Sequence, residues 1–247
     1  MIGCLRRLRG VLIAAALLAG CVPAPGAAPS AATHVDAQDV IPTAAAVDAD
    51  TPAVRASSLE RIARRMTVRV RSRGCGRIGT ASAVAVGRRL LVTNRHVIAG
   101  ADSIELNYWD GTSARARLET VATADDLALI RVSLRLPAVG RLAAGDAPEG
   151  TSLMVVGYPN GGQQKVVRAK LVEYAPLDRH PDASAVMRLS SPIAPGNSGG
   201  PVVDGSGAVV GVVFGIETAT GNGLAVPASA VQRLVDRRRA DGAPGCL

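Results

Sequence analysis

The chain has 247 residues and a formal net charge of +8, carried almost entirely by Arg. Hydrophobic residues make up 48% of it and aromatic residues only 2%, so a folded core has to be built from short aliphatic side chains. The length fits one large domain or two small ones. A basic chain can bind nucleic acid, but the arginines are scattered and few aromatic rings are present to stack on bases. We therefore expect no nucleic-acid partner and interpret the charge as a solvated basic surface.

The first twenty residues have the pattern of an export signal. Three arginines between positions 6 and 9 precede a short apolar stretch at residues 11–18, which falls short of the roughly 20 residues that a membrane-spanning helix needs. The stretch ends in Leu18-Ala19-Gly20-Cys21, which resembles the bacterial lipobox, where a signal peptidase cuts before a Cys that carries lipid. An ordinary signal peptide that ends near a Cys is the alternative. The pattern favours a signal peptide at residues 1–20, lipidation of Cys21 and an exported lipoprotein anchored to a membrane of the bacterial cell envelope.

The four cysteines limit the possible cross-links. Cys4 leaves with the signal peptide and Cys21 would carry lipid, so Cys75 and Cys246 remain. Export places these two in an environment that favours disulfides, and one intramolecular pairing is possible. Two unpaired thiols are the alternative. The three histidines do not cluster with these cysteines at ligand spacing, so we expect no metal site and no cofactor.

Residues 21–56 are rich in Ala, Pro, Thr and Asp and show no periodic apolar face. This composition predicts a disordered linker, partly extended where Pro is dense. Ser57-Ser58 can then cap a short helix over residues 59–66. We expect a folded domain at residues 57–240.

From residue 67 the pattern changes to short apolar or alternating runs between Gly and Asp-Gly turns. About a dozen such runs predict an all-β fold, either a sandwich or a barrel. The first set lies at 67–71, 81–86, 90–93, 103–108, 114–121 and 127–132, and the second at 152–156, 164–173, 185–189, 200–203, 208–214 and 223–226. The Pro- and Gly-rich segment 136–150 separates the two sets. Residues 227–239 change to helical spacing with a basic last turn, which predicts a C-terminal helix.

A glycine-rich segment contains the candidate nucleophile. Ser198 lies in Pro195-Gly196-Asn197-Ser198-Gly199-Gly200-Pro201. A serine hydroxyl becomes a good nucleophile when a base removes its proton, and the oxyanion that forms needs N–H donors held in place. Glycines on both sides let the backbone turn its amides toward the same point as the hydroxyl. The segment indicates a catalytic serine, and a glycine-rich turn between strands is the alternative.

His96 and Asp126 are the candidate base and acid. His96 directly follows an apolar strand, whereas His34 lies in the linker and His180 in a polar loop. Asp126 opens another apolar strand, where it can be buried against the imidazole, select the tautomer of the ring and stabilise its charged form. Asp125 is the competing assignment. We prefer Asp126 because the strand begins directly after it.

Together these segments resemble the trypsin-like peptidase superfamily, whose catalytic residues follow the chain order His, Asp, Ser. Thr93-Asn94-Arg95-His96-Val97 is similar to the family's histidine motif, Asp126-Leu127-Ala128-Leu129 to its aspartate motif and residues 196–201 to its serine motif. The likeness covers roughly residues 60–236, and three motifs in order are far more specific than any one of them. Within the superfamily the sequence is most similar to the bacterial HtrA-like and MarP-like proteases.

The resemblance implies an all-β chymotrypsin-like fold of two six-stranded antiparallel β-barrels, about residues 67–140 and 150–226, followed by the C-terminal helix. It implies a serine endopeptidase that forms an acyl-enzyme and acts on protein or peptide substrates, such as envelope or misfolded proteins. Asn197 stands where zymogen-type members have Asp, so we expect no activation by a newly cut N-terminus. HtrA proteins carry a PDZ domain after the protease, for which the sequence beyond residue 240 leaves no room. We therefore expect the protease domain itself to select substrates.

The same resemblance assigns the backbone N–H groups of Gly196 and Ser198 to the oxyanion hole. It places the specificity pocket along three uncharged segments, with the lining residues Pro192, Ile193, Ala194, Val213, Phe214, Gly215, Gly223 and Ala225. Such a pocket accepts a small or medium apolar side chain and disfavours Arg or Lys, whose charge would be desolvated without a partner. An inactive protease fold that serves as an envelope-anchored binding module is the alternative function, and the intact triad argues against it.

Overall fold

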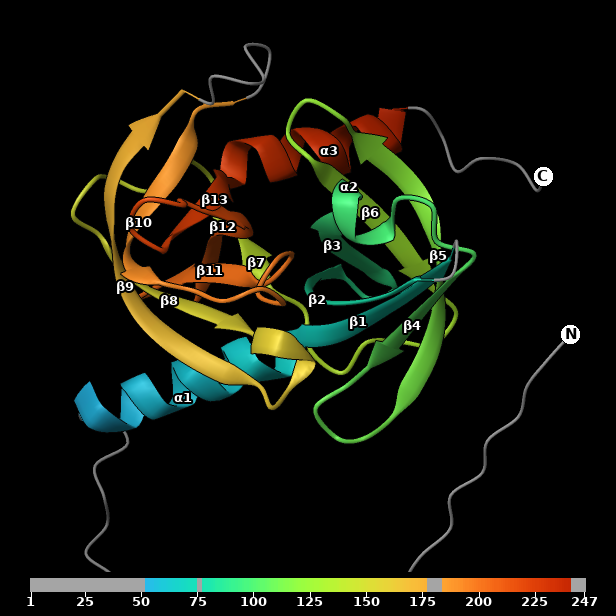
Figure 1. Cartoon of the computed structure of the whole chain (residues 1–247). Helices are drawn as coiled ribbons and strands as arrows, with labels where there is room; N and C mark the ends of the chain where they lie inside the picture. Colours follow the sequence, from blue (N-terminus) through green and yellow to red (C-terminus); the bar gives the residue numbers. More distant parts are fainter. Residues whose placement is uncertain (1–51, 75–76, 177–183, 241–247) are drawn as a thin grey trace, which may run out of the picture. The chain divides into compact units, whose positions relative to one another are not determined.

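The computed structural model describes residues 52–74, 77–176 and 184–240, all of which belong to one compact unit (Figure 1). The expected signal peptide, the lipidation site Cys21, most of the expected linker, and both Cys75 and Cys246 lie outside the described residues. Their assignments therefore stay predictions. None of the described helices is long and apolar enough to cross a membrane.

The first barrel is built from six antiparallel strands. They are β1 (Thr67–Gly74), β2 (Arg77–Gly87), β3 (Leu90–Asn94), β4 (Ser103–Asn107), β5 (Ser113–Ala122) and β6 (Leu127–Val132). Neighbours follow the order β1-β2-β3-β6-β5-β4, and β1 pairs with β4 to close the ring. Val68 and Val70 of β1 are buried because alternate side chains of a strand point to the same face. The six strands predicted here are confirmed, whereas the short helix α2 (Arg95–Ile98) after β3 was not predicted.

The second barrel has the same construction. Its strands are β8 (Ser152–Gly157), β9 (Lys165–Ala175), β10 (Val186–Pro192), β11 (Pro201–Asp204), β12 (Ala208–Ile216) and β13 (Asn222–Pro227). They follow the order β11-β8-β9-β10-β13-β12, and the pairing of β11 with β12 closes the ring. The two-residue strand β7 (Arg141–Leu142) lies in the predicted boundary segment and runs parallel to β12. The described residues thus confirm the expected all-β fold of two barrels.

Strand β8 shows how the barrels share a core. Leu153 and Val155 point into the core of the second barrel, whereas Met154 and Val156 belong to the larger apolar cluster that also fills the first barrel. The strand is buried on both faces, which is why its sequence is a continuous apolar run without alternation. Aliphatic packing is therefore continuous from one barrel to the other.

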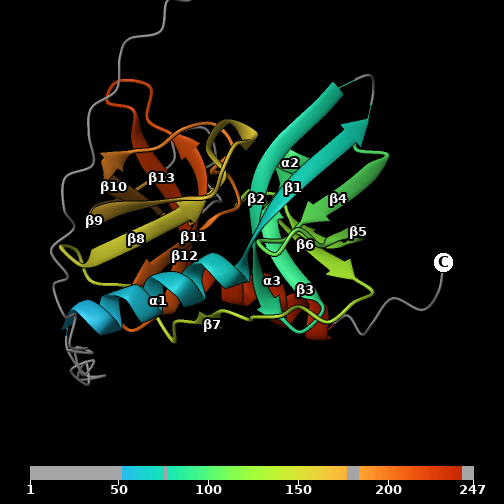
Figure 2. The same ribbon diagram turned by 90° about the horizontal axis from the view of Figure 1, so that it is seen from below.

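Helix α1 (Pro52–Met66) leads into β1 but packs against the second barrel (Figure 2). Its buried face includes Ala63 and Met66, with Leu59 partly buried beside them, a spacing of one helical stripe. The helix begins at Pro52, so the predicted start at Ser57-Ser58 is wrong, as is the linker assignment of the residues from Pro52 onward. Proline suits a first helical turn because that turn's N–H groups have no intrahelical partner.

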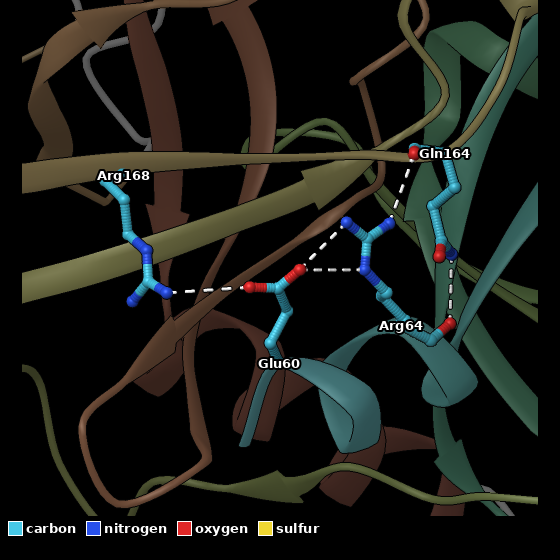
Figure 3. Close-up of polar contacts among 4 residues, drawn as sticks. All are labelled: Glu60, Arg64, Gln164 and Arg168. Atoms are coloured by element: carbon cyan, nitrogen blue, oxygen red, sulfur yellow. Dashed lines mark hydrogen bonds and ion pairs between the residues drawn. The ribbon is translucent and has the colours of Figure 1, made fainter. Parts of the chain in front are cut away.

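Polar contacts hold the C-terminal half of α1 on the loop before β9 (Figure 3). Glu60 accepts a hydrogen bond from Arg64 at 3.0 Å and pairs with Arg168 of β9 at 3.5 Å. The Arg64 guanidinium donates to the Gln164 carbonyl at 3.2 Å. In return, Gln164 Nε2 donates to the Arg64 carbonyl at 2.9 Å and to the Thr67 carbonyl at 3.2 Å. Since the last carbonyls of a helix lack intrahelical donors, this side chain of the second barrel caps α1.

Helix α3 (Ala228–Ala240) follows the second barrel and contacts β5 and β6 of the first. It confirms the predicted C-terminal helix, with Val231, Leu234 and Val235 buried. Glu119 of β5 accepts two hydrogen bonds of 2.8 Å from Arg131 of β6 and one of 3.0 Å from Arg238 of α3. Each terminal helix therefore ties one barrel to the other.

Candidate active site

His96 lies in α2, the helical turn that follows β3. Its backbone N–H donates to Asp126 Oδ1 at 3.0 Å, and its ring Nδ1 is hydrogen-bonded to Asp126 Oδ2. One carboxylate thus holds both the main chain and the ring of the histidine. With Nδ1 engaged, Nε2 is the nitrogen left to accept a proton, and 48% of the side chain is exposed.

Asp126 occupies the turn that precedes β6. Its φ of 51° is in the left-handed region, which Asp adopts more readily than most residues. Its carbonyl accepts a hydrogen bond from the Arg95 N–H at 2.9 Å and one from Asn94 Nδ2 at 3.1 Å. These bonds hold the turn in the conformation that directs the carboxylate at His96.

Asp125, the competing candidate, points elsewhere. Its carboxylate accepts a hydrogen bond from the Ser184 N–H at 2.9 Å and lies 3.8 Å from the Arg233 guanidinium of α3. The structure therefore brings Asp126, and not Asp125, to His96.

Ser198 lies in the loop between β10 and β11, where the second barrel contacts the first. Gly196 has a φ of 95° and Gly199 a φ of 83°, which glycine adopts without steric cost. A Cβ at Gly196 would approach the Tyr158 carbonyl oxygen to 2.4 Å, and one at Gly199 would approach the Ser82 carbonyl oxygen to 2.0 Å. The loop therefore needs glycine for its conformation and for its close packing against both barrels.

Four successive carbonyls of this loop accept hydrogen bonds. The Pro195 carbonyl accepts from the Asn160 N–H at 2.6 Å, and the Asn197 carbonyl accepts from the Gly200 N–H at 2.8 Å. The Gly196 carbonyl accepts from Ser82 Oγ and the Ser198 carbonyl from the Ser82 N–H, each at 2.8 Å. Because the C=O and N–H of a trans peptide point in opposite directions, the Gly196 and Ser198 N–H groups point away from Asn160 and Gly200. Within the described ranges neither of these two amides has a hydrogen-bond partner. Both are available to an oxyanion.

His96 and Ser198 line one cavity of about 520 Å³. Pro195 and Gly196 contribute from the second barrel, and much of the remaining wall comes from first-barrel residues at 77–81 and 99–101. In the part of the chain that the structure describes, no hydrogen bond joins the Ser198 hydroxyl to the His96 ring. Without substrate, catalytic hydrogen bonds are often long and shorten in the substrate complex.

The eight residues predicted for the specificity pocket do not line this cavity. Val213 and Ala225 are fully buried in the core of the second barrel. Alternate side chains of a barrel strand point into its core, so at these two positions the backbone and not the side chain is left to line a pocket. Ile193 packs against the same core and Phe214 against the larger cluster. The assignment of all eight residues to the specificity pocket stays a prediction.

Sequence reasoning missed Ser82 and Asn160, which hold the Ser198 loop. Ser82 is one small residue within the apolar strand β2 and carries no local signal. Asn160 has a φ of 53° in the turn Pro159–Gly161, and its Pro, Asn and Gly residues could have predicted a turn there. No local pattern could have predicted the contacts of either residue, since Ser82 and its acceptor Gly196 are 114 positions apart.

Two antiparallel barrels, with a His–Asp pair on one and a serine loop on the other, define the class of chymotrypsin-like folds. The chain belongs to the trypsin-like peptidase domain family, whose sequence profile matches residues 80–212, more than half of its length. The predicted family is thereby confirmed.

Curated relatives are similar over the same region. The chain is 31% identical over 163 residues to a probable periplasmic serine endoprotease, DegP-like, of Rickettsia conorii. The aligned region covers 62% of this chain and 32% of the relative. It is 28% identical over 148 residues to the serine protease Rv3671c of Mycobacterium tuberculosis, and that alignment covers 57% of this chain and 37% of the relative. The chain thus spans about a third of the length of these relatives.

Solved structures show the same fold. The active form of the Mycobacterium tuberculosis Rv3671c protease aligns with a TM-score of 0.70 at 25% identity, over 80% of this chain and 89% of that one. Its inactive form aligns with a TM-score of 0.65, also at 25% identity, over 76% of this chain and 96% of that one.

Proposed function

We propose that the protein is an HtrA-like serine endopeptidase in which Ser198 is the nucleophile and His96 the general base. Asp126 orients the imidazole and stabilises its charge. One observation carries the proposal. The Asp126-bound histidine and the serine loop line the same cavity, and the two amides that could bind an oxyanion have no other partner among the described residues.

The residues support a double-displacement hydrolysis. His96 Nε2 takes the Ser198 proton while Oγ attacks the peptide carbonyl carbon, and Asp126 stabilises the resulting imidazolium. The carbonyl electron pair moves onto oxygen, where the Gly196 and Ser198 N–H groups receive it. Collapse of this intermediate breaks the C–N bond, and His96 returns the proton to the leaving amine. Water, deprotonated by the same imidazole, then hydrolyses the acyl ester and restores Ser198.

We place this activity in the bacterial cell envelope, on protein or peptide substrates. The relative from Rickettsia conorii, described as probable and periplasmic, supports that location. Lipidation of Cys21 would anchor the enzyme to a membrane, and a disulfide between Cys75 and Cys246 would tie the end of the chain to the first barrel. The uncharged segments predicted for specificity favour cleavage after small or medium apolar side chains.

A fluorophosphonate probe tests the active site directly, because it forms a covalent bond with an activated serine. The wild type is expected to be labelled and Ser198→Ala to remain unlabelled. Ser198→Ala and His96→Ala should each lower peptide hydrolysis by several orders of magnitude with little change in melting temperature. Ser206→Ala is a matched control, since it removes an exposed serine of the same barrel. An unlabelled wild type, or near-normal turnover in either triad variant, would instead favour the inactive binding module.

A further inference from the structure

Ser82 of β2 is fully buried and engages all of its hydrogen-bonding groups. Its N–H donates to the Ser198 carbonyl at 2.8 Å. Its hydroxyl donates to the Gly196 carbonyl at 2.8 Å and accepts from the Tyr158 N–H at 3.0 Å. Its own carbonyl accepts from Thr93 Oγ1 at 2.8 Å. A single first-barrel serine thus contacts two separate segments of the second barrel.

The contacts to the Gly196 and Ser198 carbonyls hold peptides that adjoin those carrying the two oxyanion-hole amides. The two carbonyls flank Asn197, so the peptide between Asn197 and Ser198 is held on both sides. Gly196 needs this restraint most, because glycine has more backbone conformations available than any other residue. Without the Ser82 hydroxyl, the Gly196 carbonyl would lose a donor in a buried setting. A buried carbonyl without a donor is costly, so the peptide that contains it is favoured to rotate, and the neighbouring peptides that carry the Gly196 and Ser198 N–H groups then lose a restraint.

The contact to Thr93 extends the same network to the histidine. Thr93 lies near the end of β3, three positions before His96 in the sequence. Ser82 therefore lies between the strand that leads to the base and the loop that carries the nucleophile. These two parts of the site belong to different barrels, and their separation depends on contacts between the barrels.

We propose that Ser82 is a positioning residue for the hydrolysis. Its hydroxyl holds the Gly196 carbonyl so that the Gly196 and Ser198 N–H groups face the cavity that His96 also lines. This inference rests on the proposed endopeptidase function and goes beyond the triad. The backbone bond from the Ser82 N–H to Ser198 survives any substitution except proline, so side-chain variants test the hydroxyl alone.

The test compares kcat and KM of purified full-length Ser82→Ala and wild type on one peptide substrate, with active sites counted by fluorophosphonate titration. Removal of a direct oxyanion donor lowers kcat by roughly 100- to 1,000-fold. An indirect support should cost less, so we expect kcat to fall about 10- to 100-fold. KM should stay within about twofold, because the hydroxyl does not touch the substrate. Ser82→Cys keeps a weak donor at nearly the same size, so its kcat should lie between those of wild type and Ser82→Ala.

Thr67→Val is the matched control. It removes another buried first-barrel hydroxyl, which donates to the Ala63 carbonyl at 2.7 Å and does not reach the serine loop. Its melting temperature should fall while kcat stays at the wild-type value. If wild type is labelled and Ser82→Ala keeps kcat within twofold, the inference on Ser82 is overturned and the proposed function stands. If wild type is not labelled, the proposed function itself fails. Should Ser82→Ala not fold, Ser82→Cys decides by the same kcat criterion.

Discussion

Helix α1 precedes the first barrel in the chain and packs on the second, whereas α3 follows the second barrel and packs on the first (Figure 1). Both helices place an apolar face in the shared core, and both make Arg–Glu contacts with the barrel on which they pack. The environments of those contacts differ. At α1, Glu60 is 31% exposed and its partner Arg168 63%. At α3, Glu119 is only 4% exposed and lies between two arginines that are mostly buried.

The difference in burial decides how much each set of charges contributes to the free energy of unfolding. Exposed ion pairs contribute about 0–1 kcal/mol, because water solvates both partners nearly as well when they are apart. A buried carboxylate depends on its partners. The hydrogen bond from Arg131, with a further one from Arg238, lowers the pKa of Glu119 from its usual 4.5 to about 2. We infer that charge holds α3 on the first barrel, whereas apolar packing and the Gln164 cap hold α1 on the second.

Replacing Glu119 by Gln should have the largest effect. The amide keeps the shape of the side chain but leaves two mostly buried guanidinium groups without a counter-charge, which typically costs about 3 kcal/mol or more. Denaturant unfolding monitored by circular dichroism measures this loss of unfolding free energy. Glu173→Gln is the control, because it removes the charge of an exposed Glu–Arg pair, with side chains 45% and 41% exposed. Equal losses in the two variants would refute the contrast between buried and exposed charges.

Acid should also remove the stabilisation that Glu119 gives to the contact between α3 and the first barrel. The pKa of Glu119 is lower in the folded protein than in the unfolded chain, so its stabilisation is fully present above the usual value of 4.5 and is lost as the pH falls to about 2. The shift corresponds to about 3 kcal/mol. The difference in unfolding free energy between wild type and Glu119→Gln should therefore narrow between about pH 5 and about pH 2. A difference that stays constant over this range would show that Glu119 is not ionised with a lowered pKa.

The sequence predicted what short-range patterns encode and missed what depends on distant contacts. The run Leu153–Val156 and the alternating Val68 and Val70 predicted strands correctly, because burial on one or two faces leaves a periodic signal. The motifs around His96 and Ser198 are contiguous in sequence, so both the motifs and their order along the chain could be predicted. The start of α1 at Pro52 could not be predicted, because the composition of the residues just after it resembles that of a linker. The burial of the Val213 and Ala225 side chains depends on the closure of the second barrel. The family resemblance predicted the barrel but not the direction of each side chain.

The smallest predicted effect concerns the cap of α1. Gln164→Ala removes the donor to the Arg64 and Thr67 carbonyls and leaves the end of the helix without a side-chain partner from the second barrel. Net hydrogen-bond contributions of this kind are about 1 kcal/mol each, so we expect a loss of about 1–2 kcal/mol in unfolding free energy. Arg168→Gln breaks the neighbouring exposed ion pair with Glu60 and should cost less than about 0.5 kcal/mol. Both variants are measured by denaturant unfolding beside wild type. A larger loss for Arg168→Gln than for Gln164→Ala would mean that charge, and not capping, holds α1, and the contrast with α3 would then disappear.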